Sequence, residues 1–473
     1  MASDSKKAKM ADCPSPDSLP ADIVAPPGQG VICTETALVL NDMNVNEMLK
    51  DTDVAKQFDE MCDPDNPRMS TFQEISAAAY KIKNGVLRTP CTRSGLSRMY
   101  GMDIWFKKEF EQFTGSFKER GARNVLLNLP LHKRAVGVIA ASAGNHALAM
   151  SYHGQLLNTN VTVVMPKIAP IMKVQNCKVF GANVIVAGED LGESKRIALI
   201  LSKKFGMVYV NGYDHPDILA GQGTAGLEIV EQVDDIDAVV IPVGGGGLIA
   251  GAALAIKSLK PSIQIIGVEP ERCHGFADAM EAGKPISSEV KHTLADGLAV
   301  PVVGVNAFAT ARNLIDKMVT VSEQAIALAI LRLVEQEKAV VEGAGAAGVA
   351  AIVENSLEEL KGKRVVVILC GGNIDTSILG RCLERGLAAD GRLVAFKVLV
   401  PDSCSAIAQL SKLIGDMGVS IKDIIHERAW VKSDVFKVAV KVVCETRDKA
   451  QALDLEKKLR DTYEMLSWNL PAV

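Results

Sequence analysis

Short, continuous apolar runs recur along most of the chain, with segments of helical spacing between them. These runs lie at 135–140, 161–165, 182–186, 207–210, 238–241, 265–268 and 364–369. Because their apolar positions are continuous rather than alternating, the runs are typical of strands buried on both faces of a sheet. Strands that alternate with helices predict parallel sheets covered by helices, so we expect an α/β fold for the bulk of the chain.

The first ordered element is expected to be a helix over 72–82, with Thr71 as its N-cap. A short strand over 104–109 should follow it. The preceding residues, 1–68, are rich in proline and lack the alternating strand and helix patterns seen later in the chain. We therefore predict that they are mostly disordered, with one short helix around 45–61.

The pattern changes near the C-terminus. A strand at 393–400 precedes a helix with one apolar face, and two further strands are expected at 419–428 and 435–443. The last of these alternates valine with lysine and alanine, which is typical of a sheet with one polar face. A second helix over about 448–463 completes a β-α-β-β-α unit, so we expect 391–473 to form a separate α+β domain.

Composition narrows the class of protein. Of the 473 residues, 48% are hydrophobic and 23% are charged, as in a globular protein with a large core. The formal net charge of −4 would not attract nucleic acid or anionic lipid electrostatically, so neither partner is expected. No apolar run approaches the roughly 20 residues of a membrane-spanning helix, so no membrane association is expected.

Cysteine usage and the N-terminal residues indicate the compartment. The ten cysteines are scattered and form no C-x-x-C pair, so neither a zinc site nor a disulfide framework is expected. Free thiols in a chain of this size are typical of a reducing compartment. The N-terminal residues lack the apolar segment of a secretory signal, and acidic residues at 41–65 argue against a mitochondrial transit peptide. We therefore expect a cytoplasmic protein.

Four consecutive glycines, 244–247, follow a predicted buried strand and precede a helix. Free backbone N–H groups and the positive end of the helix dipole make such a loop suited to a phosphate. A tight turn is the alternative, although one or two glycines would be enough for it. A dinucleotide-binding fingerprint is not matched, because its third glycine would fall at Ile249, and no lysine ends the loop as in a P-loop.

Lys118 lies in the stretch 116–122 (SFKERGA), between small and apolar residues and a charged, helix-prone run. Near an apolar pocket, desolvation would disfavour its ammonium form and leave the amine free as a nucleophile or Schiff-base former. A solvated surface charge is the alternative, and it is the commoner role of a lysine at a helix start. Its neighbour Glu119 has no clear role, and an orientation toward solvent is the simplest expectation.

Two other polar clusters follow predicted strands. The stretch 142–146 (SAGNH) offers backbone donors suited to a carboxylate, to which Asn145 adds an amide, but an ordinary helix cap explains it equally well. The stretch 370–373 (CGGN) places the thiol of Cys370 at the end of a strand. A buried cysteine without a chemical role is the commoner outcome for such a residue.

Taken in order, the stretches 116–122, 141–146, 220–224 (AGQGT), 244–247 and 370–373 resemble the motifs of fold-type II pyridoxal 5′-phosphate (PLP) enzymes, which have a tryptophan synthase β-like fold. In detail the motifs are similar to those of threonine/serine dehydratases. The C-terminal unit resembles an ACT domain, an amino-acid-binding regulatory module that is often appended to such enzymes.

This resemblance implies a PLP-dependent catalytic domain over 69–390, built from two parallel-sheet α/β subdomains. The smaller subdomain, about 137–214, would be inserted in the larger one. It also implies an ACT-like regulatory domain over 391–473 and leaves 1–68 outside as an N-terminal extension. An amino acid is the expected effector, bound between subunits, and the expected assembly is a homodimer or homotetramer.

The resemblance also implies a role for each motif, position by position. Lys118 would be the Schiff-base lysine, with Phe117 beside it at the cofactor, and Cys370 would face the pyridine nitrogen. The phosphate cradle would consist of Gly244, Gly245, Gly246, Gly247 and Leu248. The loop for the substrate carboxylate would consist of Ser142, Ala143, Gly144, Asn145 and His146, of which Asn145 would also contact the 3′-oxygen of the cofactor.

The implied activity is deamination of a small amino acid, L-threonine to 2-oxobutanoate and ammonia, and also L-serine to pyruvate. Lys118, displaced from the cofactor by the substrate amine, would abstract the α-proton while the conjugated ring takes up the electrons. A neutral thiol at Cys370 cannot hold the pyridine nitrogen protonated, which would favour β-elimination over transamination. Threonine and serine differ by one methyl group, a discrimination of only roughly 1–3 kcal/mol, so an L-serine dehydratase is an alternative.

A serine racemase-like enzyme is another alternative, and two positions argue against it. Racemisation would need a second acid/base, a serine, where this chain has Ala143. The divalent-ion site of the racemases needs a second carboxylate after Glu269, but this chain has Cys273 and Gly275 there. No metal site is therefore expected, and Glu269 is expected to be structural. A non-catalytic amino-acid-binding regulatory protein is a further, remoter alternative.

Overall fold

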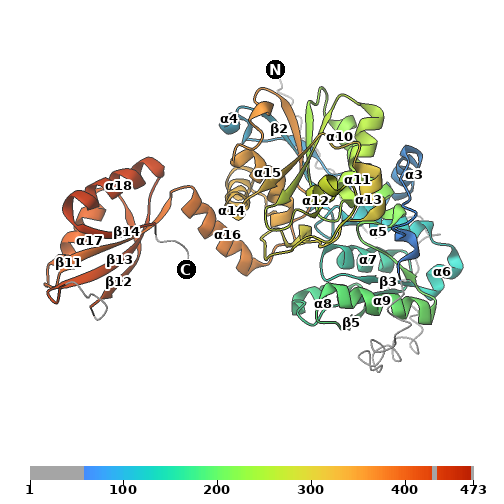
Figure 1. The fold of residues 1–473 in the computed structure, drawn as a ribbon, viewed down its shortest axis with the longest axis horizontal. Helices are drawn as coiled ribbons and strands as arrows, with labels where there is room; N and C mark the ends of the chain where they lie inside the picture. Colours follow the sequence, from blue (N-terminus) through green and yellow to red (C-terminus); the bar gives the residue numbers. More distant parts are fainter. Residues whose placement is uncertain (1–57, 429–433, 470–473) are drawn as a thin grey trace, which may run out of the picture. The chain divides into compact units, whose positions relative to one another are not determined.

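The computed structural model describes residues 58–428 and 434–469 (Figure 1). The short helix predicted around 45–61 lies largely outside these residues, although a 3₁₀ turn spans Glu60–Cys62. Most of the disorder predicted for 1–68 also falls outside them. Both expectations therefore stay predictions.

The described residues form two compact units. The smaller unit contains 125–210, and the larger one contains 60–124 together with the described residues from 211 onward. Each unit is built around a parallel sheet of its own. The α/β fold class predicted from the continuous apolar runs is confirmed.

The smaller unit is centred on a four-stranded parallel sheet with the order β5-β4-β3-β6. The strands are β3 (Val138–Ala141), β4 (Val161–Met165), β5 (Asn183–Val186) and β6 (Val208–Tyr209). The helices are α6 (Leu131–Val136), α7 (Asn145–Leu156), α8 (Ile171–Val179) and α9 (Leu191–Phe205). Every residue of β4 is buried, as its continuous apolar sequence predicts.

The larger unit is centred on a six-stranded sheet with the order β1-β2-β10-β7-β8-β9, in which only β1 is antiparallel to its neighbour. The strands are β1 (Cys91–Arg93), β2 (Asp103–Lys107), β7 (Ala238–Pro242), β8 (Gln264–Pro270), β9 (Lys317–Val321) and β10 (Arg364–Ile368). The last strand in chain order, β10, lies between β2 and β7. The residues that follow it therefore emerge near the middle of the sheet.

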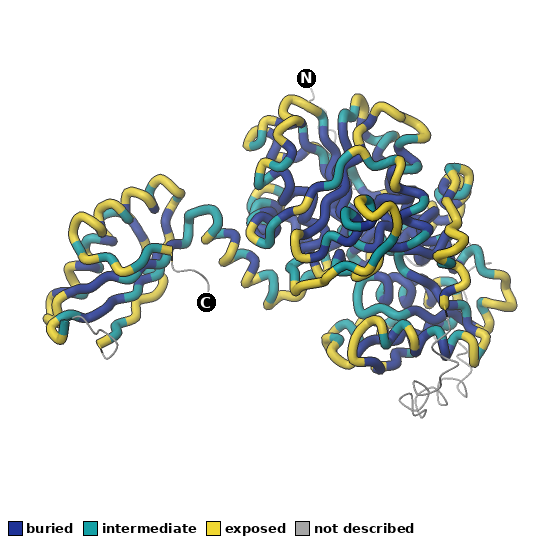
Figure 2. The backbone as a smooth tube through the Cα atoms, in the orientation of Figure 1, coloured by how far each residue is buried: buried dark blue, intermediate teal, exposed yellow. Residues whose placement is uncertain are grey.

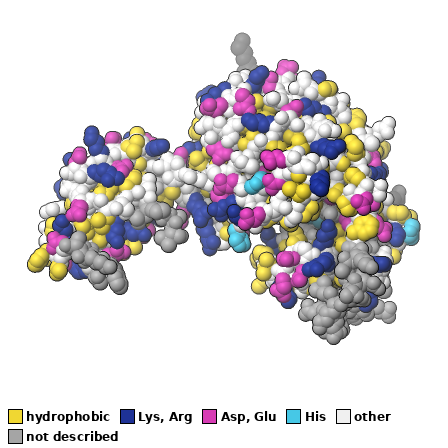
Figure 3. All heavy atoms as spheres, in the orientation of Figure 1, with side chains coloured by type: hydrophobic (Ala, Val, Ile, Leu, Met, Phe, Trp, Pro, Cys, Tyr) yellow, Lys and Arg dark blue, Asp and Glu magenta, His cyan; other side chains and the backbone are white. Residues whose placement is uncertain are grey.

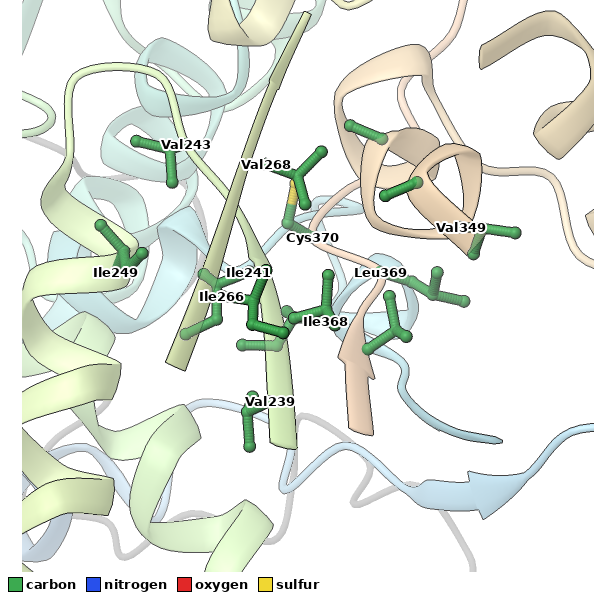
Figure 4. Packing of buried hydrophobic residues seen from close by; sticks show 14 of the residues in the cluster. Val239, Ile241, Val243, Ile249, Ile266, Val268, Val349, Ile368, Leu369 and Cys370 are labelled. Carbon is green, nitrogen blue, oxygen red and sulfur yellow. The ribbon is translucent and has the colours of Figure 1, made fainter. Parts of the chain in front are cut away.

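Helices surround this sheet and bury its strands (Figures 1 and 2). They are α3 (Phe72–Ile82), α4 (Ser97–Tyr100), α5 (Lys118–Asn128, which ends in the smaller unit), α10 (Pro216–Gln232), α11 (Gly247–Leu259), α12 (Gly275–Ala282), α13 (Val305–Ala311), α14 (Glu323–Arg332), α15 (Gly343–Val353) and α16 (Thr376–Ala389). Short 3₁₀ segments lie at Glu109–Glu111, Asp296–Leu298 and Glu358–Leu360, and a π-helical turn at Leu333–Glu337. Strand residues such as Val239, Ile241, Ile266, Val268 and Ile368 form the core (Figure 4).

The helix predicted at 72–82 is confirmed as α3, together with its cap. The Thr71 hydroxyl accepts a hydrogen bond from the Glu74 N–H at 3.3 Å, and the Glu74 carboxylate accepts one from the Thr71 N–H at 2.9 Å. This reciprocal pair is a capping box, which satisfies two backbone donors that the helix itself leaves free.

The C-terminal part of the larger unit has an antiparallel sheet with the order β12-β13-β11-β14. Its elements are β11 (Leu393–Pro401), α17 (Ala406–Asp416), β12 (Ser420–Glu427), β13 (Lys437–Glu445), α18 (Lys449–Thr462) and β14 (Glu464–Trp468). Buried residues of the two helices, among them Leu410, Ile414, Leu455 and Leu459, form one cluster with Phe396 of the sheet. This arrangement fits the ACT-like domain expected from the sequence, and that identity stays a prediction.

The strand β14 is absent from the β-α-β-β-α pattern expected for this region. Its sequence, EMLSW, has neither a continuous apolar run nor a strict alternation, so the hydrophobic pattern did not indicate it. The strand forms because β11 offers it an edge, against which it pairs with a register shift between Lys397 and Val398. The observed unit is therefore β-α-β-β-α-β.

On the face drawn in Figure 3, acidic and basic side chains are interspersed over the described residues, in keeping with the formal net charge of −4. Within the described ranges, no helix is both long enough and apolar enough to cross a membrane. The same residues contain no group of three or more His, Cys, Asp or Glu side chains placed to hold a metal ion.

Candidate active site

Lys118 is the first residue of α5, and the residue before it is bound to the end of β10. The Phe117 N–H donates a hydrogen bond to the Cys370 carbonyl at 3.1 Å. Cys370 lies two residues after the end of β10 and is buried among apolar side chains (Figure 4). The ammonium group of Lys118 donates to the Gly212 carbonyl at 2.5 Å. Two motifs that are far apart in the sequence, those of Lys118 and Cys370, are thus neighbours in the structure.

The surroundings change the acidity of both groups. Burial lowers the pKa of Lys118 to about 8, although the nearby Cys370 and Glu342 act in the opposite direction. Burial also raises the pKa of the Cys370 thiol well above its usual range, and Glu342 acts in the same direction. Lys118 itself keeps part of its surface accessible. The structure therefore favours a desolvated, readily deprotonated amine over a solvated surface charge, beside a thiol that stays neutral.

A pKa near 8 predicts unusual reactivity for Lys118 in the cofactor-free protein. At pH 7.5 about a quarter of its amine would be neutral, against roughly 0.1% for a lysine of ordinary pKa. Acylation at a series of pH values, followed for the Lys118 peptide by mass spectrometry, should therefore give a midpoint near pH 8 in the folded protein. The urea-unfolded protein is the control and should give a midpoint above pH 10. Equal midpoints in the two states would contradict a desolvated Lys118.

The four glycines follow β7, and the last of them begins α11. Gly246 has φ of +92°, a left-handed conformation that favours glycine. The others have no room for a side chain: a Cβ on Gly244 would lie 2.9 Å from the Leu298 Cα, and one on Gly247 would lie 2.5 Å from the Tyr213 carbonyl oxygen. Backbone conformation and close packing therefore require glycine at these positions. The first N–H groups of α11 have no carbonyl partner within their own helix, as an anion site would need.

The short segment 212–213 joins the glycine loop to the lysine. Gly212 accepts the hydrogen bond from Lys118, and Tyr213 packs so closely on the loop that a Cβ on Gly245 would overlap its ring. A glycine loop at a helix N-terminus, the desolvated amine of Lys118 and the neutral thiol of Cys370 thus lie together in the larger unit. These groups fit PLP, which needs a phosphate site, a lysine for its aldehyde and a partner for its pyridine nitrogen.

The stretch 142–146 lies in the smaller unit, between β3 and α7. Gly144 is the N-cap of α7 and makes no side-chain hydrogen bond there, so the helix-cap alternative stays open. The Ser142 hydroxyl accepts from the Gly144 N–H at 3.3 Å, and the His146 ring lies 3.2 Å from the Val210 carbonyl. The role of this stretch in binding a carboxylate stays a prediction.

The expectation that Glu119 points to solvent is wrong. Its side chain is buried, and its carboxylate accepts a hydrogen bond from the Thr114 N–H in the loop just before Lys118. The Thr114 carbonyl in turn accepts from the Asn373 amide at 2.7 Å. Helical spacing could not indicate this, because α5 is enclosed on several sides. Glu119 therefore helps to hold the loop that leads into Lys118.

A second buried network surrounds the same helix and was not foreseen. The Arg120 guanidinium is fully buried and forms ion pairs with Glu109 and Glu228, each at 2.7 Å. Lys107, also fully buried, pairs with Glu228 at 2.5 Å. Four charged residues at 107, 109, 120 and 228 in the sequence gave no joint signal, because only the fold brings them together. The network anchors the first turn of α5, on which Lys118 is located.

Glu342 is a further residue that sequence motifs did not indicate. It is buried at the N-cap of α15, where it makes no side-chain cap, and its N–H donates to the Gly371 carbonyl at 3.1 Å. Its charge affects the pKa of both Lys118 and Cys370. A single glutamate before a glycine- and alanine-rich helix has no distinctive pattern, so only the fold reveals it.

Glu269 is buried at the end of β8, where its two carboxylate oxygens accept hydrogen bonds from the N–H groups of Phe276 and Ala277, at 2.8 and 2.9 Å. These are the free donors at the start of α12. Burial raises the pKa of Glu269 to about 8 despite these bonds. Glu269 therefore acts as a helix cap in this structure.

Comparison with known proteins agrees with this geometry. A family model described as pyridoxal-phosphate dependent enzyme matches residues 82–371, more than half of the chain. An L-threonine ammonia-lyase of Thermotoga maritima is 40% identical over 392 residues, which cover 83% of this chain and 97% of that protein.

Two solved structures are also similar. The processed form of threonine deaminase isoform 2 from Solanum lycopersicum has a TM-score of 0.63 and 36% identity, and the match covers 68% of this chain and 95% of that one. Maize serine racemase has a TM-score of 0.63 and 32% identity, with coverage of 67% and 98%. The chain therefore belongs to the pyridoxal-phosphate-dependent enzymes of fold type II, in the branch that includes the L-threonine ammonia-lyases.

Proposed function

We propose that this chain deaminates L-threonine to 2-oxobutanoate and ammonia, and L-serine to pyruvate and ammonia. The observation that supports this most directly is the setting of Lys118. Burial lowers its pKa to about 8, its Nζ donates to the Gly212 carbonyl, and the neutral thiol of Cys370 is near enough to affect that pKa. A relative of the same domain extent is named for the threonine reaction. The reaction needs no oxidant or reductant. The β-hydroxyl is lost as water, and a later hydrolysis consumes one water and releases ammonia.

Each group of residues has a proposed task. Lys118 would hold the cofactor through its aldehyde, and its free Nζ would take the α-proton of the substrate. The N–H groups of Gly244, Gly245, Gly246, Gly247 and Leu248 would hold the phosphate, and Phe117 would contribute to the cofactor site. Ser142, Ala143, Gly144, Asn145 and His146 bind the substrate carboxylate, and Asn145 also contacts the 3′-oxygen. When bound, PLP supplies a conjugated electron sink for the α-carbon.

Cys370 controls the outcome through its protonation state. Burial and the nearby Glu342 keep its thiol protonated and uncharged, so Cys370 would leave the pyridine nitrogen of bound PLP without a full positive charge. Bound PLP would then be a weaker electron sink, which would favour prompt loss of the β-hydroxyl. This supports elimination over transamination.

Two assays test the proposal. The purified protein should absorb near the edge of the visible range because of bound PLP, and it should form 2-oxobutanoate from L-threonine and pyruvate from L-serine. A colourless protein that forms neither product, even with added PLP, would refute the proposed function. The ratio of the two rates would decide between a threonine and a serine dehydratase.

A racemase is the second candidate, since maize serine racemase shares the fold at 32% identity. Ala143, in place of a serine, argues against it, because the second face of the cofactor then lacks that acid/base. L-serine incubated with the enzyme should therefore give pyruvate with little D-serine, as measured by chiral chromatography. D-serine formation at a rate comparable to that of pyruvate would overturn this choice.

We further propose a domain organisation and setting. The catalytic domain spans 69–390, with a smaller subdomain of about 137–214 inserted, and an ACT-like regulatory domain spans 391–473. An amino acid is the proposed effector, the chain is a homodimer or homotetramer, and its compartment is the cytoplasm. Dehydratase rates measured with each amino acid added in turn, together with light scattering, test the effector and the assembly.

A further inference from the structure

Gln222 lies in the middle of α10 and has an unusual side chain. It is fully buried, and neither its amide oxygen nor its amide nitrogen has a hydrogen-bond partner among the described residues. Other polar side chains of the same helix are satisfied: the Thr224 hydroxyl donates to the Gly221 carbonyl at 2.7 Å, and the Gln232 amide donates to the Thr89 carbonyl at 3.0 Å. Burying an amide without partners is unfavourable, so Gln222 calls for an explanation.

The two glycines beside Gln222 explain where it points. A Cβ on Gly221 would lie 2.5 Å from the Arg120 carbonyl oxygen of α5, and one on Gly223 would lie 2.9 Å from the Gly251 carbonyl oxygen of α11. Close packing thus places α10 directly against both the lysine helix and the glycine-loop helix. Between these contacts, the Gln222 Oε1 lies 2.8 Å from the position that a Cβ on Gly247 would occupy.

Gly247 is the first residue of α11, so the Gln222 amide reaches the helix end at which the anion site is expected. Backbone N–H groups and the helix dipole favour a negative charge there. The oxygen and nitrogen of an amide exchange places by a half-turn of its last torsion, which lets Gln222 present N–H donors to an anion. A dianionic phosphate accepts several such hydrogen bonds.

We propose that Gln222 is a further cofactor-binding residue, whose side-chain amide donates a hydrogen bond to the phosphate held by the glycine loop. This inference rests on the proposed function, in which Gly244–Gly247 bind the PLP phosphate. It also gives the AGQGT stretch a purpose: its glycines bring three helices together, and its glutamine takes part in the site that they form.

The full-length protein, loaded with PLP and freed of it, provides the test. Gln222→Met keeps the length of the side chain but removes its donors, and Gln222→Glu keeps the shape but adds a negative charge. The PLP dissociation constant, measured by fluorescence titration, should rise about 10- to 100-fold in Gln222→Met, as for loss of a hydrogen bond to a charged group, and further in Gln222→Glu. The ³¹P NMR signal of the bound phosphate should shift in both.

Gln232→Glu is the matched control, since Gln232 is on the same helix and accepts a hydrogen bond from Lys107 at 2.9 Å, away from the glycine loop. It should leave the PLP dissociation constant and the ³¹P shift unchanged. The cofactor-free Gln222→Met protein should unfold at the wild-type temperature or higher, because the substitution removes an unsatisfied buried amide.

Unchanged PLP affinity and an unchanged ³¹P shift in both Gln222 variants would overturn the inference and indicate a purely structural glutamine. A cofactor-free Gln222→Met protein that unfolds earlier, with PLP affinity retained, would do the same. If Gln222→Met does not fold, Gln222→Glu decides instead. Cofactor-free wild type and cofactor-free Gln222→Glu are then titrated with inorganic phosphate, and equal affinities would overturn the inference. A wild type that binds no PLP would refute the proposed function itself, which keeps the two failures distinct.

Discussion

Replacing Lys118 with alanine is expected to lower the rate of threonine deamination by about 10³-fold or more. Nζ is both the group that binds the cofactor aldehyde and the base for the α-proton, and a positioned general base alone contributes roughly 10²- to 10⁴-fold. The substitution also removes an ammonium ion from a desolvated position, where burial lowers its pKa to about 8. We therefore expect the folded protein to remain stable while activity is lost.

Three measurements check this prediction on Lys118→Ala. The rate of 2-oxobutanoate formation should fall, the absorbance of the bound cofactor near the visible edge should disappear, and the thermal unfolding temperature should stay close to that of the cofactor-free wild type. Lys284→Ala, which removes an exposed lysine, is the control and should change none of them. A Lys118→Ala enzyme that keeps a tenth of its activity would be incompatible with the proposed role.

Replacing Arg120 with methionine is expected to lower the free energy of unfolding by about 3–5 kcal/mol. Arg120 is fully buried and pairs with Glu109, which is also fully buried, and with Glu228. Methionine fills most of the volume but leaves a carboxylate of Glu109 enclosed without its main partner. Removing one member of a buried pair costs far more than the pair contributes, since the remaining charge has lost both water and its counterion.

Urea unfolding measures this loss, and Arg88→Met is the matched control. Arg88 pairs with Glu231, on the same helix as Glu228, but both side chains are more than half exposed. That pair should contribute no more than about 0–1 kcal/mol. The double variant Glu109→Gln/Arg120→Met should recover part of the lost stability, because it no longer buries an unpaired charge. A loss below about 1 kcal/mol for Arg120→Met would contradict this account.

The same ion-pair network makes the stability of the protein depend on pH in the acid range. Burial by itself would raise the pKa of Glu109, but Arg120 and other donors outweigh it and hold the pKa below the ordinary value of 4.5. A carboxyl whose pKa is lowered on folding stabilises the protein above its ordinary pKa, and this contribution is lost as the pH falls through the lowered value. Wild-type stability should therefore decline below about pH 4.5 in part through Glu109.

Much of the fold could be predicted from local patterns. A strand buried on both faces leaves a continuous apolar run, and Thr71 with Glu74 leaves a capping signature, because both effects act over a few neighbouring residues. The strand β14 could not be predicted in this way. Its pairing depends on the edge that β11 offers, and its own five residues have no strand pattern.

Some residues of the candidate site could likewise be predicted from local sequence, and others could not. The glycine loop, Lys118 and Cys370 stand out in the sequence, since each occupies a strand-to-helix connection with an unusual residue composition. Glu119 and Glu342 do not stand out. The orientation of Glu119 was predicted wrongly because helical spacing assumes one solvent face, whereas α5 is enclosed, and the importance of Glu342 lies only in its closeness to Lys118 and Cys370.

By itself the sequence determined the α/β class, the strand-to-helix turns and the residue types available for chemistry, because these follow from local periodicity and from the special conformations of glycine. Only the tertiary structure decided what those residues do. Whether Lys118 is a solvated cation or a desolvated amine depends on Gly212, Cys370 and Glu342, which come from three other segments. Burial and charge act through space, and their balance cannot be calculated until the fold has brought the partners together.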